Sequence, residues 1–180
     1  MPYRTIILWF LILLPGYIFS QPLSDESAKE AAKNLKIAAA KMLKAYTSRD
    51  FEASADFVHP KAIEAYFGDR SRLVTALESM MYKMDSLSYI MVAGAIQGIS
   101  KIVRAKTELQ AIVTQSVRAK IPNGSMNTIT SLLAVSSDSG QTWYFIGIGN
   151  KKRADLEKII PQLSPDLEIP EPVKPTIIPD

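Results

Sequence analysis

Few side chains in this sequence of 180 residues combine the types and spacing that catalysis requires. His59 is the only histidine, and histidine is the side chain that most readily transfers protons near neutral pH. It stands directly before Pro60, at the expected end of a helix, where an imidazole commonly caps backbone groups. No aspartate or glutamate has metal-ligand spacing to it. We therefore expect His59 to be structural, and we predict no catalytic residue, no metal site and no cofactor.

Gln115 is the most informative polar residue because it interrupts an apolar set of alternating residues. The alternation over residues 108–121 predicts one long strand, with the odd positions on a core and the even positions in water. A buried amide without a partner costs about 1–3 kcal/mol. Gln115 therefore either bonds a group across the sheet or orients a ligand in a cavity.

Five further residues are candidates for lining such a cavity: Tyr89, Met91, Trp143, Tyr66 and His59. Tyrosines can supply hydroxyl groups to a ligand. A tyrosine on an apolar stripe is nevertheless more often a core residue whose hydroxyl is satisfied. The cavity candidates therefore depend on where the fold places them.

The first 21 residues have the layout of a secretory signal peptide. A short basic start is followed by the apolar run Ile6 to Leu14, then by Pro15-Gly16 and the small residue Ser20. A membrane span needs about 20 apolar residues, and this run is much shorter. We expect an exported protein, periplasmic or extracellular, without stable membrane anchoring after cleavage.

Composition excludes several classes of function. The chain has no cysteine, which rules out disulfides, thiol nucleophiles and cysteine metal sites. The formal net charge is +3 without a clustered basic face, so nucleic acid is not an expected partner. A lysine-rich helix over residues 28–48 would suit an anionic membrane surface, but its alanine-diluted stripe also suits packing on a sheet, which we favour.

Helical periodicity and capping residues place the helices. After a polar leader over residues 22–27, we expect helices at 28–48, 51–58 capped by Asp50, 72–85 capped by Asp69 or Ser71, and 152–162. Residues 61–67 are either a turn of helix or a short edge strand. Residues 163–180 contain five prolines and no periodicity, which predicts an extended or disordered tail.

Strands follow in the second half of the chain. We expect them at 87–96, with a bulge at Gly94, and at 101–104, 108–121, 126–135 and 141–148. Asn123-Gly124 is a strong hairpin signal because both residues tolerate positive φ. Helices followed by an antiparallel meander indicate an α+β domain over residues 28–162.

Residues 136–143 match the Asp-box pattern S-x-D-x-G-x-T-W of sialidases and related propellers. In that motif the aspartate bonds local amides in a hairpin turn, and the tryptophan packs beneath. A propeller would need repeated copies, and this chain has one. We expect a tight turn here and no glycan hydrolysis.

Three stretches resemble the nuclear-transport-factor-2-like superfamily, which includes ketosteroid isomerase: Ala45 to Glu52, Ala55 to Pro60 and Gly140 to Phe145. The resemblance covers roughly residues 28–149. It implies a cone-like curved sheet of about four main strands wrapped on N-terminal helices, with a cavity inside and a sheet face that often forms dimers. This fold hosts enzymes, carriers and assembly modules alike.

The isomerase resemblance also implies a base carboxylate on an inner strand and a Tyr/Asp pair that stabilises an oxyanion. The apolar faces of 126–135 and 141–148 carry no carboxylate, and Glu108 falls on the polar face of its strand. We therefore expect a non-catalytic binding or interaction module with a cavity for a small apolar ligand, and a homodimer through the sheet face. The alternative is an isomerase or dehydratase that uses His59 or a cavity tyrosine.

Overall fold

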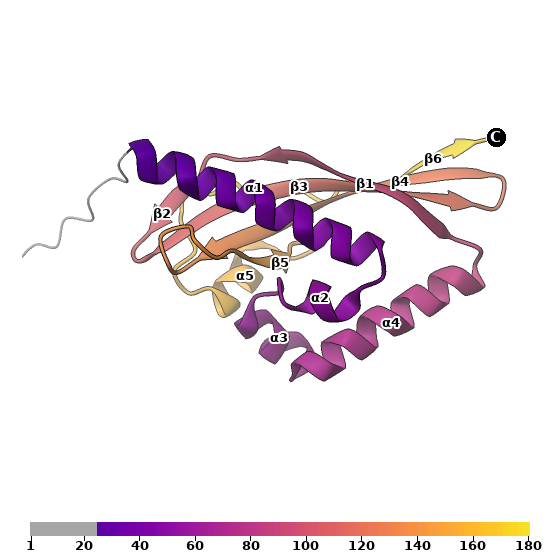
Figure 1. Ribbon diagram of the computed structural model, residues 1–180, viewed down its shortest axis with the longest axis horizontal. Coiled ribbons are helices and arrows are strands. Elements are labelled where there is room, and N and C mark those ends of the chain that lie inside the picture. Colours follow the sequence, from indigo (N-terminus) through magenta and orange to yellow (C-terminus); the bar gives the residue numbers. More distant parts are fainter. Residues whose placement is uncertain (1–24) are drawn as a thin grey trace, which may run out of the picture.

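The computed structural model describes residues 25–180, in which five helices and six strands form an α+β domain (Figure 1). The helices are α1 (Asp25–Thr47), α2 (Phe51–Ala55), α3 (Pro60–Phe67), α4 (Arg70–Ser86) and α5 (Arg153–Ile159). The strands are β1 (Ile90–Ile99), β2 (Val103–Ala105), β3 (Glu108–Ile121), β4 (Gly124–Ser136), β5 (Tyr144–Gly147) and β6 (Thr176–Pro179). The predicted signal peptide lies outside the described residues.

All six strands belong to one open antiparallel sheet with the order β1-β3-β4-β5. Strand β2 extends the β1 edge of β3, and β6 pairs with the start of β4. The prediction of one long strand over residues 108–121 is confirmed. So is the hairpin that follows, since Asn123 and Gly124 have φ values of 65° and 152°. The core of the fold is therefore the β3–β4 ribbon.

Helix α1 packs along one face of this ribbon. Its buried residues Ala31, Leu35, Ala39 and Met42 contact Leu109, Ala111, Val113, Trp143 and Phe145. Two glycines permit the close approach: a Cβ at Gly140 would lie 2.3 Å from the Cβ of Ala31, and one at Gly94 would lie 3.0 Å from Leu43. Gly94 is thus a packing site, and the bulges of β1 fall instead at Val92 and Gln97.

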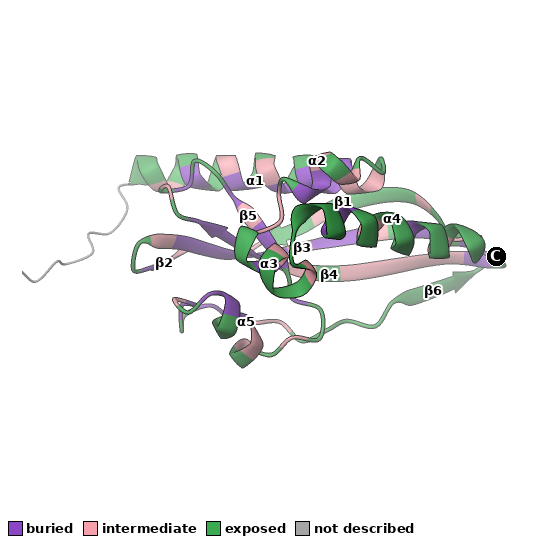
Figure 2. Ribbon diagram, turned by 90° about the horizontal axis from the view of Figure 1, so that it is seen from below, coloured by how far each residue is buried: buried purple, intermediate pink, exposed green. Residues whose placement is uncertain are grey.

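The opposite face of β3 is covered at its beginning, where the sequence predicted exposure to water. Gln110 is fully buried and Ile112 is nearly so. Helix α5 and the residues after it lie on this face, and they contribute Leu156, Ile160, Leu163 and Leu167 to a second core (Figure 2). Farther along the strand Arg118 and Lys120 are exposed, as expected. The sheet therefore separates two cores.

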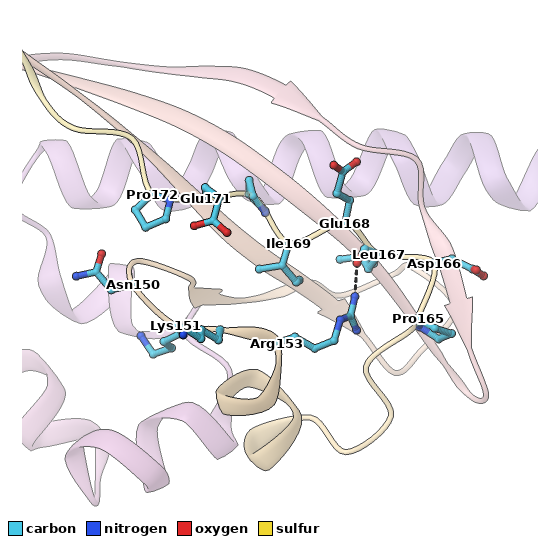
Figure 3. A pocket seen from close by; sticks show the side chains of 12 residues that line it. Asn150, Lys151, Arg153, Pro165, Asp166, Leu167, Glu168, Ile169, Glu171 and Pro172 are labelled. Atoms are coloured by element: carbon cyan, nitrogen blue, oxygen red, sulfur yellow. Dashed lines mark hydrogen bonds between the residues drawn. The ribbon is translucent and has the colours of Figure 1, made fainter.

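Residues 163–180, for which an extended or a disordered course was expected, have a defined course in the structure. Leu163 and Leu167 are buried, and the Arg153 guanidinium donates to the carbonyl oxygen of Ser164 at 3.1 Å. It also donates to the carbonyl oxygen of Leu167 (Figure 3). The last residues add β6 to the sheet edge. The prolines keep the chain extended, while the leucines between them bury enough apolar surface to fix it.

Helix boundaries follow the caps. Asp50 and Asp69 accept hydrogen bonds from the amides of Ala53 and Arg72. Helix α2 therefore begins at residue 51 as predicted, and α4, capped by Asp69, begins at Arg70, two residues before the predicted start. The open alternative at 61–67 is resolved as helix α3. Helix α2 ends earlier than expected, at Ala55, because Phe57 and His59 exchange backbone hydrogen bonds with Phe145 of β5. This connection closes the β5 edge of the sheet.

Strand β5 is shorter than the predicted 141–148 because its first residues belong to the Asp-box turn. Asp138 accepts hydrogen bonds from the amides of Gln141 (3.0 Å) and Thr142 (2.9 Å). Burial tends to raise the pKa of Asp138, but these amides and the hydroxyl of Ser136 lower it below the usual value. The turn is the local device that the motif predicts.

Candidate functional site

A groove of about 460 Å³ lies on the α1 face of the sheet. Its floor is the half of the β3–β4 ribbon on which Gln115 lies, where Gln115 pairs with Thr130 and Ala119 pairs with Met126. Its lining residues come from six segments of the chain: Tyr46 of α1, Met84 of α4, Met91 of β1, Gln115, Val117 and Ala119 of β3, Met126, Thr128, Thr130, Ser131 and Leu132 of β4, and Gly147, Gly149 and Lys151 at and after β5.

Gln115 is the buried polar residue of this groove. Its side chain is on the odd, core-facing side of β3, as predicted, and the residue is 9% exposed. Its side-chain oxygen Oε1 is buried without a hydrogen-bond partner among the described residues, a state it shares only with Nε of Arg104. An unsatisfied buried acceptor costs about 1–3 kcal/mol. A turn of this side chain toward the groove would bring the oxygen to a donor on a bound molecule.

The apolar surface of the groove includes three methionines from three different elements, Met84, Met91 and Met126. Methionine is unbranched and polarisable, so it adapts to ligands of different shape. Arg49 and Asp85 join the ends of α1 and α4 through two hydrogen bonds of 2.7 and 2.6 Å. These residues lie close in sequence to Tyr46 and Met84, so the ion pair holds the two helical walls of the groove together.

The titratable groups that line the groove are those of Tyr46 and Lys151. Burial raises the pKa of the Tyr46 hydroxyl, which keeps it neutral at physiological pH. The Lys151 amine donates to the carbonyl oxygen of Gly147 at 3.0 Å and lies 4.8 Å from the centre of the Tyr66 ring. One end of the groove thus carries a fixed positive charge.

The structure brings together two of the six predicted site residues, Gln115 and Met91. Tyr66 is an exposed residue of α3 that reaches the groove only through Lys151. Tyr89 is half-buried just before β1 and is not among the lining residues. Trp143 is a core residue beneath the Asp-box turn, and its indole nitrogen donates to the Gly140 carbonyl at 3.2 Å.

His59 lies away from the groove and has a local structural contact. It is the residue before α3, and its Nδ1 accepts a hydrogen bond from the Lys61 amide at 3.2 Å. Its ring packs edge-to-face against Tyr144, with centroids 6.1 Å apart. Burial lowers the pKa of His59; nearby Glu108 acts in the opposite direction and Lys61 in the same direction. The imidazole therefore caps the beginning of α3, not the end of the preceding helix.

Several lining residues were not identified from the sequence. Val117 and Ala119 follow from the same alternation that singled out Gln115, and Met126 follows from the hairpin register. Met84 and Lys151 come from segments whose position depends on the whole fold, and no local pattern marks them. The sequence thus indicated only lining residues that lie on the strands of the sheet.

A second, more polar pocket of about 630 Å³ lies between the beginning of α5 and the tail, and Lys151 also borders it (Figure 3). Arg153, which lines this pocket, donates hydrogen bonds to two carbonyl oxygens of the tail, so its side chain holds the tail in place. Across residues 25–180 no group of three or more His, Cys, Asp or Glu side chains could hold a metal ion. Within the same range no helix is long and apolar enough to cross a membrane.

Comparison of the sequence with protein-family models and with curated proteins gives no significant match. The geometry of the groove is accordingly the basis for the functional argument.

Proposed function

We propose that this protein is an exported, non-catalytic module that binds a small, largely apolar molecule in the groove, with Gln115 as its polar anchor. The observation that carries this proposal is the buried, unpartnered Oε1 of Gln115 on an otherwise mostly apolar floor. A hydrogen-bond donor on the ligand would remove the free-energy cost of that oxygen.

Size and lining support the same proposal. Sites for small molecules are typically about 300–1,000 Å³, apolar, and fitted with a few convergent polar groups. The groove has a volume of about 460 Å³ and combines three methionines with Gln115, Thr128 and Thr130. Most of its lining comes from helix and sheet, which restrain it more firmly than loops would, while Gly149 and Lys151 come from the segment after β5.

The proposal also includes the superfamily, the cellular location and the oligomeric state of the protein. The groove lies against the sheet beyond the α1 core, where the resemblance to the nuclear-transport-factor-2-like superfamily places a cavity at the open end of a cone-like sheet. Residues 1–21 would direct the chain to the periplasm or the exterior. A homodimer would use the sheet face left exposed around Arg118 and Lys120.

Native mass spectrometry of the protein isolated from its host tests this function. We expect one small molecule bound per chain, and one equivalent of added 1-dodecanol bound after the natural ligand is removed. The variant Thr128→Phe places a large side chain in the groove and should abolish both adducts. Asn127→Phe is the matched control, because residue 127 faces the other side of the same strand.

Absence of both the co-purified molecule and the dodecanol adduct from the folded wild-type protein would contradict the proposal. Equal loss of the adducts in both variants would place the binding site elsewhere.

A further inference from the structure

We infer that the ligand of the groove is an amphipathic anion, whose charged group lies at Lys151 and whose apolar part extends along β4 toward Met126. This inference rests on the proposed function and adds the chemical class of the ligand. A fatty carboxylate and an alkyl sulfate share the chemistry, which is one negative charge on a long apolar chain.

The groove has a polar and an apolar end. Strand register places Gly147 opposite Leu132, beside Lys151, and places Met91, Ala119 and Met126 in one row at the other end. Leu132 and Met126 are six residues apart on β4, or about 20 Å at about 3.4 Å per residue. Gln115 and Thr130 lie between the two ends. The lining therefore offers a positive charge, then a hydrogen-bond acceptor, then methionines.

Among the residues of the 25–180 range that line the groove, Lys151 is the only charged one. The residue is half-buried, and its amine contacts the Gly147 carbonyl and the Tyr66 ring. Carboxylates of the tail border the adjoining pocket, yet no carboxylate of residues 25–180 lies within 4.0 Å of this amine. An ammonium ion has three donors, so Lys151 retains capacity for an anion after its bond to Gly147.

Open space adjoins the amine. A Cβ built on Gly147 or Gly149 would meet no atom within 4 Å, although both residues line the groove. Gly147 has an ordinary backbone conformation, so its missing side chain is not required by the fold. The hydroxyl of Thr130, which lines the groove on the same face as Gln115, can donate a further hydrogen bond to a negatively charged group. This end is thus shaped and charged for an anionic head group.

Calorimetric titration of the full chain with dodecanoate and with 1-dodecanol tests the inference. We expect dodecanoate to bind more tightly than dodecanol. Lys151→Met keeps the apolar stem of the side chain and should weaken dodecanoate about tenfold, and dodecanol by a much smaller factor. Lys151→Arg should retain the preference for the anion. Lys152→Met removes the same charge from the neighbouring exposed residue and should change neither affinity.

The outcomes separate the two proposals. Equal binding of the two probes by the wild-type protein, with no effect of Lys151→Met, would overturn the anionic class and leave the groove as a site for neutral molecules. A similar loss of dodecanoate binding in Lys152→Met would show that the effect comes from the net charge of the protein, and it would also overturn the inferred anionic class. Failure of both probes to bind the folded protein would remove the proposed function itself. Gly147→Leu, which occupies the space beside the amine, should weaken dodecanoate at least as much as Lys151→Met.

Discussion

At the scale of residues, two buried glutamines of β3 differ in what surrounds them. Gln110 donates to the carbonyl oxygen of Gln162 (3.1 Å) and to Glu108 (3.0 Å), and accepts from the Ser164 amide (2.9 Å). Gln115 faces the other side of the sheet, and its Oε1 has no partner among the described residues. The first amide holds the tail, whereas the second is the group that we propose binds a ligand.

This difference predicts opposite changes in stability. Gln115→Met should raise the free energy of unfolding of the ligand-free protein by about 1 kcal/mol, because it removes an unsatisfied buried acceptor. Gln110→Met should lower the free energy of unfolding by about 3 kcal/mol, because it breaks three hydrogen bonds and leaves buried partners unpaired. Urea unfolding of the two variants measures both changes. A loss in Gln115→Met as large as that in Gln110→Met would show that the Gln115 oxygen has a partner.

Sequence patterning identified Gln115 because a period of two is visible in any single strand. It misjudged Gln110, which falls on the same polar alternation as Lys120, because alternation cannot show where a distant segment will cover the sheet. His59 illustrates the same limit: its position beside a proline predicted a cap, but the helix that it caps follows it. Lys151 carries no local signal at all.

At the scale of elements, helix α5 and the tail form one unit that covers the second face of the sheet. Leu156 and Leu167 bury their side chains against Leu133 and Ile146, and Arg153 fixes the tail backbone from the helix. Strand β6 differs, since its isoleucines Ile177 and Ile178 remain more than half exposed. The stability contributed by the C-terminal segment is therefore concentrated in its first part.

Two substitutions separate these parts. Leu167→Ala should lower the free energy of unfolding by about 3 kcal/mol, as expected for truncating a buried leucine. Ile177→Ala removes a similar amount of side chain from β6 and should change stability by less than about 0.5 kcal/mol. Chemical denaturation of both variants measures the contrast. Equal, small effects would mean that the tail does not pack on the sheet in solution.

Element types were predictable wherever the sequence combines a period with a cap or turn. The long strand, its Asn-Gly hairpin and the helices capped by Asp50 and Asp69 all meet this condition. The tail does not, because its composition left an extended and a disordered course open, and Leu163 and Leu167 had no neighbours in sequence to reveal their burial. Such packing depends on surface supplied by β3 and β4.

At the scale of the whole molecule, the two faces of the open sheet have different roles. One face carries α1 over half of its length and leaves the other half as the groove floor. The opposite face carries α5 and the tail, whose core stabilises the ribbon on which the groove depends. The α+β class follows from the sequence, whereas the groove exists only once α1, α4 and the segment after β5 are placed around the ribbon.

The central claim is that the groove beside Gln115 is the binding site, and the methionines allow a direct test. NMR spectra of the full chain labelled on its methionine methyl groups should be recorded with and without 1-dodecanol, with assignment by single Met→Leu variants. The account predicts shifts for Met84, Met91 and Met126, which line the groove, and none for Met42 or Met80. Shifts confined to Met42 or Met80, or no shift at saturating dodecanol, would contradict it.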